Sequence, residues 1–203
     1  MKLCYSPTSP YVRKVVVTAM ETGAEADIER IPNNVWDPAT EIAVTNPLGK
    51  VPALTTDDGT VLFDSPVICE YLDSLHDGEK LFPAAGPARW QALRRQALCD
   101  GVLDAAILRM LEGRLREEGM RSEKWTNRQA AAVGRALDAL ENEADSLADD
   151  LTIGHIAIGV TLGYLDFRYA DENWRGDHPA LADWYEDFAE RPSMMATIPK
   201  DPS

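Results

Sequence analysis

The sequence predicts a mixed α/β unit followed by an all-helical unit. Short apolar runs and helical patterns alternate through the first 76 residues. After residue 88 the strand-like runs disappear, and long segments rich in alanine, leucine, arginine and glutamate take over. Turn-forming residues cluster between these regions, where the periodicity lapses. We therefore expect an α/β domain over 1–76, a linker over 77–87 and a helical domain over 88–203.

Each part of the α/β unit has its own local signal. Short apolar runs predict strands, and apolar residues three and four positions apart predict helices. The turn Asp57-Asp58-Gly59 between two apolar runs indicates a β-hairpin. In chain order we expect a strand Lys2–Tyr5, a helix Pro10–Gly23, a strand Asp27–Ile31, a weak helix Pro38–Thr45, a hairpin Ala53–Phe63 and a helix Ser65–Leu75.

The remainder of the chain shows helical spacing only. Four helices are expected, over 88–118, 123–148, 153–170 and 179–190. Prolines 192, 199 and 202 follow the last of them, and they predict an irregular tail.

Composition and charge exclude several classes of protein. Hydrophobic residues make up 45% and charged residues 27%, which is typical of a folded globular chain. The chain has 20 basic and 34 acidic residues, a net charge of -14, and neither part is basic. Nucleic acid is therefore not an expected partner. No apolar run reaches the length of a membrane span, and no signal peptide precedes the first strand, so we expect a cytoplasmic protein that does not bind membranes.

Metal and disulfide chemistry are also not expected. The cysteines at positions 4, 69 and 99 are odd in number and widely spaced. The histidines at 76, 155 and 178 follow no metal-ligand spacing. We therefore predict no metal site and no disulfide framework.

The first segment that could carry chemistry is the entry to the first helix. Ser9 precedes Pro10 there, and this pair is typical of a helix N-terminus because serine caps free N–H groups and proline has a suitable φ. A hydroxyl at this positive end can also hydrogen-bond an anion such as a thiolate. Ser9 is thus either a cap alone or a cap that also contacts an anionic sulfur.

Two further junctions could bind parts of the same ligand. The Val51-Pro52 bond before a strand is a candidate cis peptide, which would leave the Val51 backbone free to pair with an extended peptide. An ordinary trans proline is the alternative. Asp64 and Ser65 open the next helix, where N–H groups could bind a carboxylate and Asp64 an ammonium. Together the junctions suit a short anionic peptide.

These motifs resemble those of a known family. Asn46–Leu54 followed by Asp64-Ser65 is similar to the ligand-binding region of glutathione S-transferases. The first 76 residues resemble their thioredoxin-like domain, and the helical remainder resembles their C-terminal domain. Ser6–Lys14 and Gly163–Arg168 resemble a bacterial branch of the family. The resemblance covers nearly the whole chain and implies the cytosolic glutathione transferase architecture.

The resemblance implies roles for individual residues. Ser9 would contact the sulfur of glutathione, Val51 the cysteinyl backbone beside a cis Pro52, and Asp64 with Ser65 the γ-glutamyl end. Other implied contacts are Lys50 and Trp36 near the glycyl end, Asp100 at the γ-glutamyl amine across a dimer interface, and an electrophile pocket lined by Leu103–Leu111 with Tyr164 or Tyr169. Tyr5, Ser6 and Thr8 remain alternatives to Ser9.

The implied function is that of a glutathione transferase with a role in detoxification. Glutathione would be the co-substrate, its thiolate would attack a small hydrophobic electrophile, and the protein would be a homodimer, with Arg94 and Arg95 as a pointer to the interface. The alternatives are a non-catalytic ligand- or partner-binding protein of this fold and a glutathione-dependent isomerase or dehalogenase.

Two departures from the family pattern affect these expectations. His155 replaces the aspartate of a Ser/Thr-x-x-Asp capping box at Thr152, so we expect an incomplete helix cap. Ser9 stands where some relatives have cysteine. Glutaredoxin-like thiol exchange needs a protein thiolate at that point and is therefore not expected.

Overall fold

The α/β part of the protein is a four-stranded sheet with helices on its faces. The computed structural model describes residues 1–148 and 150–201. The elements of this part are β1 (Lys2–Tyr5), α1 (Pro10–Glu21), η1 (Glu25–Asp27), β2 (Glu29–Pro32), α2 (Ile42–Thr45), β3 (Ala53–Thr55), β4 (Val61–Leu62) and α3 (Ser65–Ser74). Every expected strand and helix is present. The expected weak helix Pro38–Thr45 forms only over its last turn, as α2.

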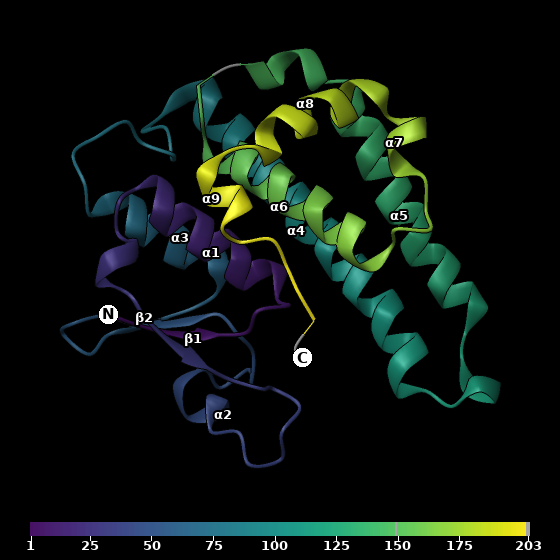
Figure 1. Cartoon of the computed structure of the whole chain (residues 1–203), viewed down its shortest axis with the longest axis horizontal. Coiled ribbons are helices and arrows are strands. Elements are labelled where there is room, and N and C mark those ends of the chain that lie inside the picture. Colours follow the sequence, from purple (N-terminus) through teal and green to yellow (C-terminus); the bar gives the residue numbers. More distant parts are fainter. Residues whose placement is uncertain (149, 202–203) are drawn as a thin grey trace.

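The sheet has the strand order β2-β1-β3-β4. β1 pairs in parallel with β2 and antiparallel with β3, and β4 pairs antiparallel with β3. In Figure 1, α1 and α3 lie together above the sheet, and α2 lies on its opposite side. The connection from β1 through α1 to β2 supplies the parallel pair, and the hairpin predicted from Asp57-Asp58-Gly59 supplies β3 and β4.

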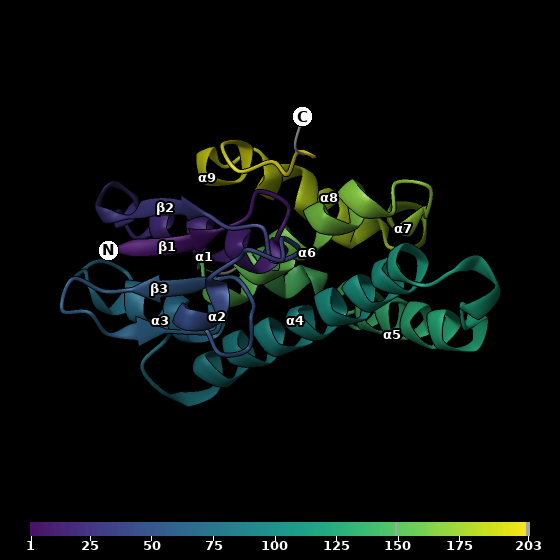
Figure 2. The ribbon, with the colours of Figure 1, turned by 90° about the horizontal axis from the view of Figure 1, so that it is seen from below.

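The rest of the chain is helical. It contains α4 (Gly86–Leu115), η2 (Glu118–Met120), α5 (Glu123–Glu141), η3 (Ala144–Ala148), α6 (Ile153–Arg168), α7 (Trp174–Asp177), α8 (Pro179–Ala189) and α9 (Pro192–Met195). α4 is the longest element and packs against α5 and α6, while α6 also contacts α1 (Figure 2). α6 is the centre of the helical part, because every residue from Ile153 to Leu165 is buried.

Three details of the helical part differ from the sequence expectation. The first helix begins at Gly86, inside the expected linker, because Pro87 is compatible with the first turn of a helix. The expected helix 123–148 ends at Glu141, and η3 follows as a separate turn. The tail is not wholly irregular, because Pro192 starts the short helix α9 instead of ending helical structure.

The helix cap at His155 is complete, so the expectation of an incomplete cap is wrong. The backbone N–H of Thr152 donates to Nδ1 of His155 at 2.9 Å, and the side chain of Thr152 faces the third residue of α6. A neutral imidazole nitrogen accepts a hydrogen bond as a carboxylate oxygen does. Histidine can therefore take the place of the acidic residue in the capping box.

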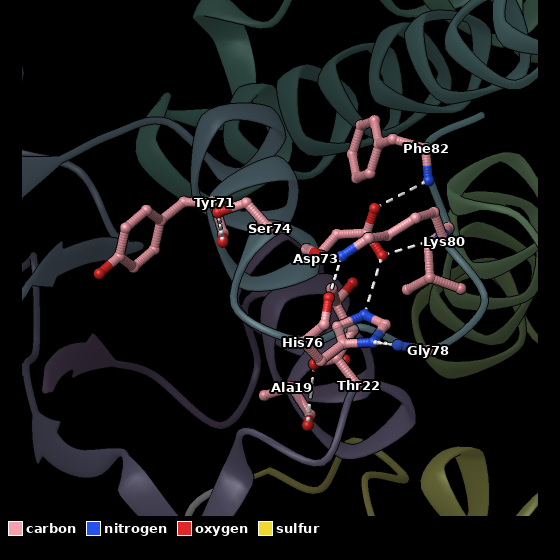
Figure 3. Close-up of polar contacts among 11 residues, drawn as sticks. Ala19, Thr22, Tyr71, Asp73, Ser74, His76, Gly78, Lys80 and Phe82 are labelled. Carbon is pink, nitrogen blue, oxygen red and sulfur yellow. Dashed lines mark hydrogen bonds and ion pairs between the residues drawn. The ribbon is translucent and has the colours of Figure 1, made fainter. Parts of the chain in front are cut away.

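The linker between α3 and α4 is fixed by the buried Asp73. Its carboxylate accepts hydrogen bonds from the backbone N–H groups of Leu81 at 2.8 Å and Phe82 at 3.1 Å. Nε2 of His76 lies 3.2 Å from Oδ1 of the same carboxylate, and Nζ of Lys80 donates to the carbonyl of Asp73 at 2.7 Å (Figure 3). The expected linker is thus an ordered segment.

The end of α1 is joined to the start of α9 by Glu21. Its carboxylate accepts from Nε of Arg191 at 3.0 Å, from Nη2 at 2.7 Å and from the hydroxyl of Ser193. Burial raises the pKa of Glu21, but the hydrogen bonds from Arg191 and Ser193 outweigh it and bring the pKa below its usual value of 4.5. The contact therefore favours the ionised carboxylate.

We expect Glu21→Gln to flatten the acid dependence of stability. A carboxyl group with a lowered folded-state pKa stabilises the fold above its unfolded pKa, and this contribution is lost as pH falls through the folded-state value. The wild type should therefore lose more stability than the variant below about pH 4.5. Urea unfolding across the acid range measures this, with the exposed Glu29→Gln as the control. Equal losses in wild type and Glu21→Gln would contradict the assignment.

No helix of residues 1–148 and 150–201 combines the length and the apolar character that crossing a bilayer requires.

Candidate functional site

The three junctions singled out in the sequence lie at one edge of the sheet. Cys4 of β1 pairs with Ala53 of β3, and Leu54 of β3 pairs with Leu62 of β4. β1 and β4 therefore run in the same direction and end at the edge where β3 begins. Because α1 follows β1 and α3 follows β4, both helix N-termini open at this edge, beside the Val51-Pro52 segment.

Ser9 is the N-cap of α1, as the sequence predicts. Its backbone is extended, with φ -81° and ψ 119°, and its Oγ accepts a hydrogen bond from the N–H of Val12 at 3.3 Å. Pro10 occupies the first turn. A serine hydroxyl has one donor and two acceptor sites, so the cap uses an acceptor site and leaves the proton available to a ligand. The half-buried hydroxyl also lies at the positive end of a 12-residue helix.

The Val51 segment has a free backbone. The Val51-Pro52 peptide bond is cis, which is the form that the family resemblance implies and not the trans form that is usual for such a bond. β3 starts only at Ala53, and none of the hydrogen bonds found among the described residues uses the N–H or C=O of Val51. Val51 is half-buried and Pro52 is buried. The unpaired Val51 backbone can therefore hydrogen-bond an extended peptide, as a strand edge does.

Asp64 and Ser65 begin α3, and no side chain of the described residues caps the N-terminus of this helix. Asp64 holds the N-cap position, but its side chain makes no capping hydrogen bond. Ser65 is buried at the first helical position, followed by Pro66, whereas Asp64 is exposed. The first N–H groups of α3 are thus available to an anion, and the neighbouring Asp64 carboxylate is available to a cation.

The other candidates lie further out. Lys50 is exposed, and its carbonyl accepts from Nδ2 of Asn46 at 2.7 Å. Trp36 is 52% exposed in the loop between β2 and α2, with the guanidinium of Arg114 from α4 6.0 Å from its ring centroid. This loop therefore reaches the far end of α4, away from the first turn of α3.

Tyr5, the alternative to Ser9, lies on the other side of β1. Its ring packs under the guanidinium of Arg30 from β2, 5.6 Å from the ring centroid. β2 and β3 flank β1 on opposite sides, so Tyr5 faces the β2 side while Val51 lies on the β3 side. This arrangement favours Ser9. Ser6 and Thr8 are half-buried in the same loop and remain alternatives.

None of the three cysteines has the environment of a reactive thiolate. All are free, and Cys69 and Cys99 are fully buried. Burial raises the pKa of Cys69 to about 11 and that of Cys99 to about 12. Burial also raises the pKa of Cys4, although a hydrogen bond with Thr45 opposes it. Cys69 and Cys99 are thus small apolar residues of the core, whereas Cys4 is only half-buried.

The helical part contributes an acidic face opposite α1. Nζ of Lys14, which is fully buried, donates to both carboxylate oxygens of Asp100 in α4, at 2.6 and 2.8 Å. Burial raises the pKa of Asp100 against the effect of Lys14, and the charges of Asp64 and Asp104 raise it further. Asp100 is therefore close to Asp64, but it is paired within its own chain.

Two tyrosines line the space between α1 and the helical part. The hydroxyl of Tyr11 donates to Asp104, and burial followed by this hydrogen bond raises its pKa well above the usual range. Burial raises the pKa of Tyr164 to about 12. Tyr164 also borders a small cavity together with Ser9. Both phenols are thus neutral beside the Ser9 helix end, and the hydroxyl proton of Tyr11 is already donated to Asp104.

The sequence does not reveal that Lys14 is buried, and it suggests an interface role for Arg95 that the structure does not support. Lys14 directly follows Arg13 in α1, and nothing in the local sequence predicts that it is buried. Arg95 is only 2% exposed and contacts Glu143 at 3.2 Å and Ser146, while Arg94 contacts Glu143 at 2.6 Å. Arg95 is therefore occupied within the chain and does not indicate a dimer interface.

The histidines take part in structural contacts. His178 lies 2.8 Å from the carbonyl of Trp174 and 3.1 Å from Asp138, and His76 contacts the linker residues described above. Within 1–148 and 150–201, no group of three or more His, Cys, Asp or Glu residues has an arrangement that could hold a metal ion.

Comparisons with known proteins agree with this architecture. Residues 8–75 match the family model for the N-terminal domain of glutathione S-transferase, and residues 123–187 match the model for its C-terminal domain. The chain is 34% identical, over 98% of both chains, to the uncharacterized GST-like protein YibF of Escherichia coli K12.

Two solved structures of a glutathione transferase family member from Pseudomonas fluorescens Pf-5 are also similar. One holds glutathione and has a TM-score of 0.94, 44% identity and 98% coverage of both chains. The other holds S-(propanoic acid)-glutathione and has a TM-score of 0.91, 44% identity, and coverage of 98% of this chain and 100% of that chain.

Proposed function

Because the chain belongs to the glutathione S-transferase family, we propose that it is a glutathione transferase: it binds glutathione, stabilises the thiolate and promotes attack on a small hydrophobic electrophile. The observation that carries the proposal is the meeting of two helix N-termini and one unpaired backbone segment at a single sheet edge. No other described part of the chain combines these three features.

Each feature matches one part of the tripeptide. The γ-glutamyl carboxylate would accept hydrogen bonds at the start of α3, from Ser65 and the first N–H groups, and its ammonium would lie beside Asp64. The cysteinyl backbone would pair with Val51, next to Pro52, which places the sulfur at Ser9. Lys50 would lie near the glycyl carboxylate.

Ser9 would act on the sulfur as a hydrogen-bond donor. A free thiol has a pKa of about 8.5, so only a few per cent is thiolate at neutral pH. The end of α1 and the Ser9 hydroxyl both interact more favourably with the thiolate than with the thiol, and together they lower the pKa of the bound sulfur. The thiolate then forms the new carbon–sulfur bond with the electrophile and displaces its leaving group or adds to its double bond.

The electrophile would lie between α1 and the helical part, next to Tyr164. A relative that is 44% identical has been solved with a propanoic acid group on the glutathione sulfur. A ligand of this kind supports the proposal that such a site has room for a small group on the sulfur. The neutral phenol of Tyr164 would supply a hydrogen bond there, whereas the hydroxyl proton of Tyr11 is already donated to Asp104.

We also propose a cytoplasmic homodimer with a role in detoxification. The three free cysteines suit a reducing compartment. Val67 of α3 is 46% exposed and Trp90 of α4 is 67% exposed, and apolar side chains of this size favour contact with a partner surface. Sedimentation at several protein concentrations tests the dimer.

Glutathione binding by wild type and Asp64→Asn is the direct test. We expect calorimetry to show saturable binding to the wild type and about 10- to 100-fold weaker binding to the variant, because a charge-assisted hydrogen bond contributes about 1.5–3 kcal/mol. Asp77→Asn, a change at another exposed acid with no ion pair among the described residues, should bind as the wild type does. Absence of glutathione binding to the wild type would refute the proposal.

Turnover separates the proposed transferase from its alternatives. Conjugates formed from glutathione and a panel of electrophiles support the transferase. Binding without consumption of any electrophile supports the ligand- or partner-binding protein. Release of halide with glutathione recovered unconjugated supports the dehalogenase. Formation of an isomer with glutathione recovered unconjugated supports the isomerase.

A further inference from the structure

A second cavity lies on the opposite side of β1 from the proposed glutathione site. Its volume is about 220 Å³, and it is bordered by the end of β1 with the loop that follows, one face of α1, Arg30 of β2 and the C-terminal tail from Ala196 to Lys200. Figures 1 and 2 show this tail returning from α9 past α1. Val12 and Val16 of α1 and Ile198 of the tail form apolar walls.

The cavity is cationic although the protein is strongly acidic. Arg13, Arg30 and Lys200 line it, and no aspartate or glutamate does. The chain as a whole carries a net charge of -14. Three basic groups around one small cavity, without an acidic group among its lining residues, produce a local positive potential opposite in sign to the overall charge.

Arg13 supplies this charge from inside the protein. It is only 8% exposed, and its guanidinium donates to neutral groups, Oγ1 of Thr197 at 3.2 Å and the carbonyl of Met194 at 3.1 Å. Among the described residues, none forms an ion pair with Arg13. Burial lowers the pKa of Arg13, and Tyr185 and Asp166 oppose this effect. Asp166 is itself paired with Arg175 at 2.6 Å, so Arg13 holds the tail in place without an ion-pair partner of its own among the described residues.

The other two cations lie at the solvent side of the cavity. Arg30 is exposed and has a single ion-pair partner, Glu25, at 2.7 Å. Lys200 is exposed, and in the part of the chain that the structure describes it has no ion-pair partner. Both side chains can therefore reorient toward a ligand, and Arg30 has further guanidinium N–H groups to donate.

We propose that this cavity binds a small aliphatic carboxylate, with its hydrocarbon part against Val12, Val16 and Ile198 and its carboxylate between Arg30 and Lys200. The volume is equivalent to about seven water-sized groups, which suits an acid of about four to six carbons. The planar guanidinium of Arg30 matches a carboxylate in two parallel hydrogen bonds. The apolar walls favour an aliphatic acid over an inorganic anion.

This carboxylate site is distinct from the proposed glutathione site. Tyr5 and Arg30 border it on the β2 side of β1, whereas Val51, Asp64 and Ser65 lie on the β3 and β4 side. Ser6 and Pro7 of the loop before α1 also line the cavity, so this loop is the part of the chain that separates it from Ser9. Ligands at the two sites should therefore bind at the same time. The inference does not depend on whether the protein is a transferase.

Calorimetric titration with pentanoate, in the presence of saturating glutathione, tests the proposal. We expect saturable binding, about tenfold weaker in Arg30→Gln and in Lys200→Gln, because each change removes one of the two solvent-exposed cations that contact the carboxylate. The matched controls Arg135→Gln and Lys124→Gln change exposed basic residues of α5 and should bind as the wild type does. Pentanamide, which has the same shape but no charge, should not bind.

The location of binding can be read independently from methyl chemical shifts. Pentanoate should shift the methyl resonances of Val12, Val16 and Ile198. Three results would overturn the proposal: no saturable binding, equal loss of affinity in the Arg30→Gln and Arg135→Gln variants, or competition between pentanoate and glutathione. Failure of glutathione binding alone would overturn the proposed function and leave this inference intact.

Discussion

Replacing Lys14 with methionine is expected to destabilise the protein by about 3–5 kcal/mol. The Lys14 side chain is fully buried, and its ammonium donates to both oxygens of Asp100, which is 20% exposed. Methionine fills a similar volume, so the main change is the loss of the positive charge. It leaves a mostly buried carboxylate without its partner between α1 and α4. A loss of this size is a large fraction of the 5–15 kcal/mol typical of a folded protein.

A double-mutant cycle separates the charge effect from packing. Asp100→Leu alone should be similarly destabilising, because it leaves a buried ammonium, whereas Lys14→Met/Asp100→Leu should recover most of the loss. Lys2→Met is the control, since Lys2 and Glu29 form a 3.9 Å pair that is 66% and 63% exposed and should contribute less than about 1 kcal/mol. Urea unfolding gives all the values. A double variant no more stable than either single variant would show that packing dominates.

The elements predicted correctly are those with local causes. The strand Lys2–Tyr5 and the Asp57-Asp58-Gly59 hairpin follow from apolar runs and turn chemistry, and the start of α1 follows from Ser9 and Pro10. Each of these signals depends on residues close together in the chain. The same is true of α6, which the helical spacing over 153–170 predicts.

The features that could not be predicted depend on contacts distant in sequence. Arg13 and Lys14 look like ordinary basic residues of a surface helix, yet both are buried. Arg13 donates hydrogen bonds to Met194 and Thr197, and Lys14 donates to Asp100. Their partners lie 86 or more positions away. The complete helix cap at His155 has a different cause. The capping-box pattern predicts a carboxylate at this position, but a neutral imidazole nitrogen also accepts the hydrogen bond from the backbone N–H of Thr152.

The candidate site was predictable as a set of positions but not as a geometry. Helix-entry serines and a Val-Pro bond mark Ser9, Pro52 and Ser65 in the sequence. Their meeting at one edge depends on β1 and β3 being antiparallel, which pairing across about 50 positions decides. The sequence also could not indicate that Tyr5 faces Arg30, on the side away from Val51.

Replacing Ser9 with alanine is expected to lower the rate of conjugation at neutral pH about 10- to 100-fold. The expectation follows from the proposed transferase activity. Removing a hydroxyl that donates to a thiolate costs about 1.5–3 kcal/mol, which raises the pKa of the bound thiol by about one to two. Less thiolate is then present near neutral pH. Above the raised pKa the thiol ionises without help, so the rates of variant and wild type should converge as pH rises.

The loss of the helix cap must be separated from this effect. Ser9→Ala also removes a capping hydrogen bond, which contributes about 1 kcal/mol to stability. Ser122→Ala is a matched control, because Ser122 caps α5 with the same geometry, its Oγ accepting from the N–H of Trp125 at 3.3 Å, as Ser9 does from Val12. Both variants should lose similar stability, but only Ser9→Ala should shift the pH profile and the ultraviolet thiolate absorbance of bound glutathione to higher pH. If both pH profiles coincide with that of the wild type, Ser9 is only a helix cap, and the thiolate donor must be sought at Ser6 or Thr8.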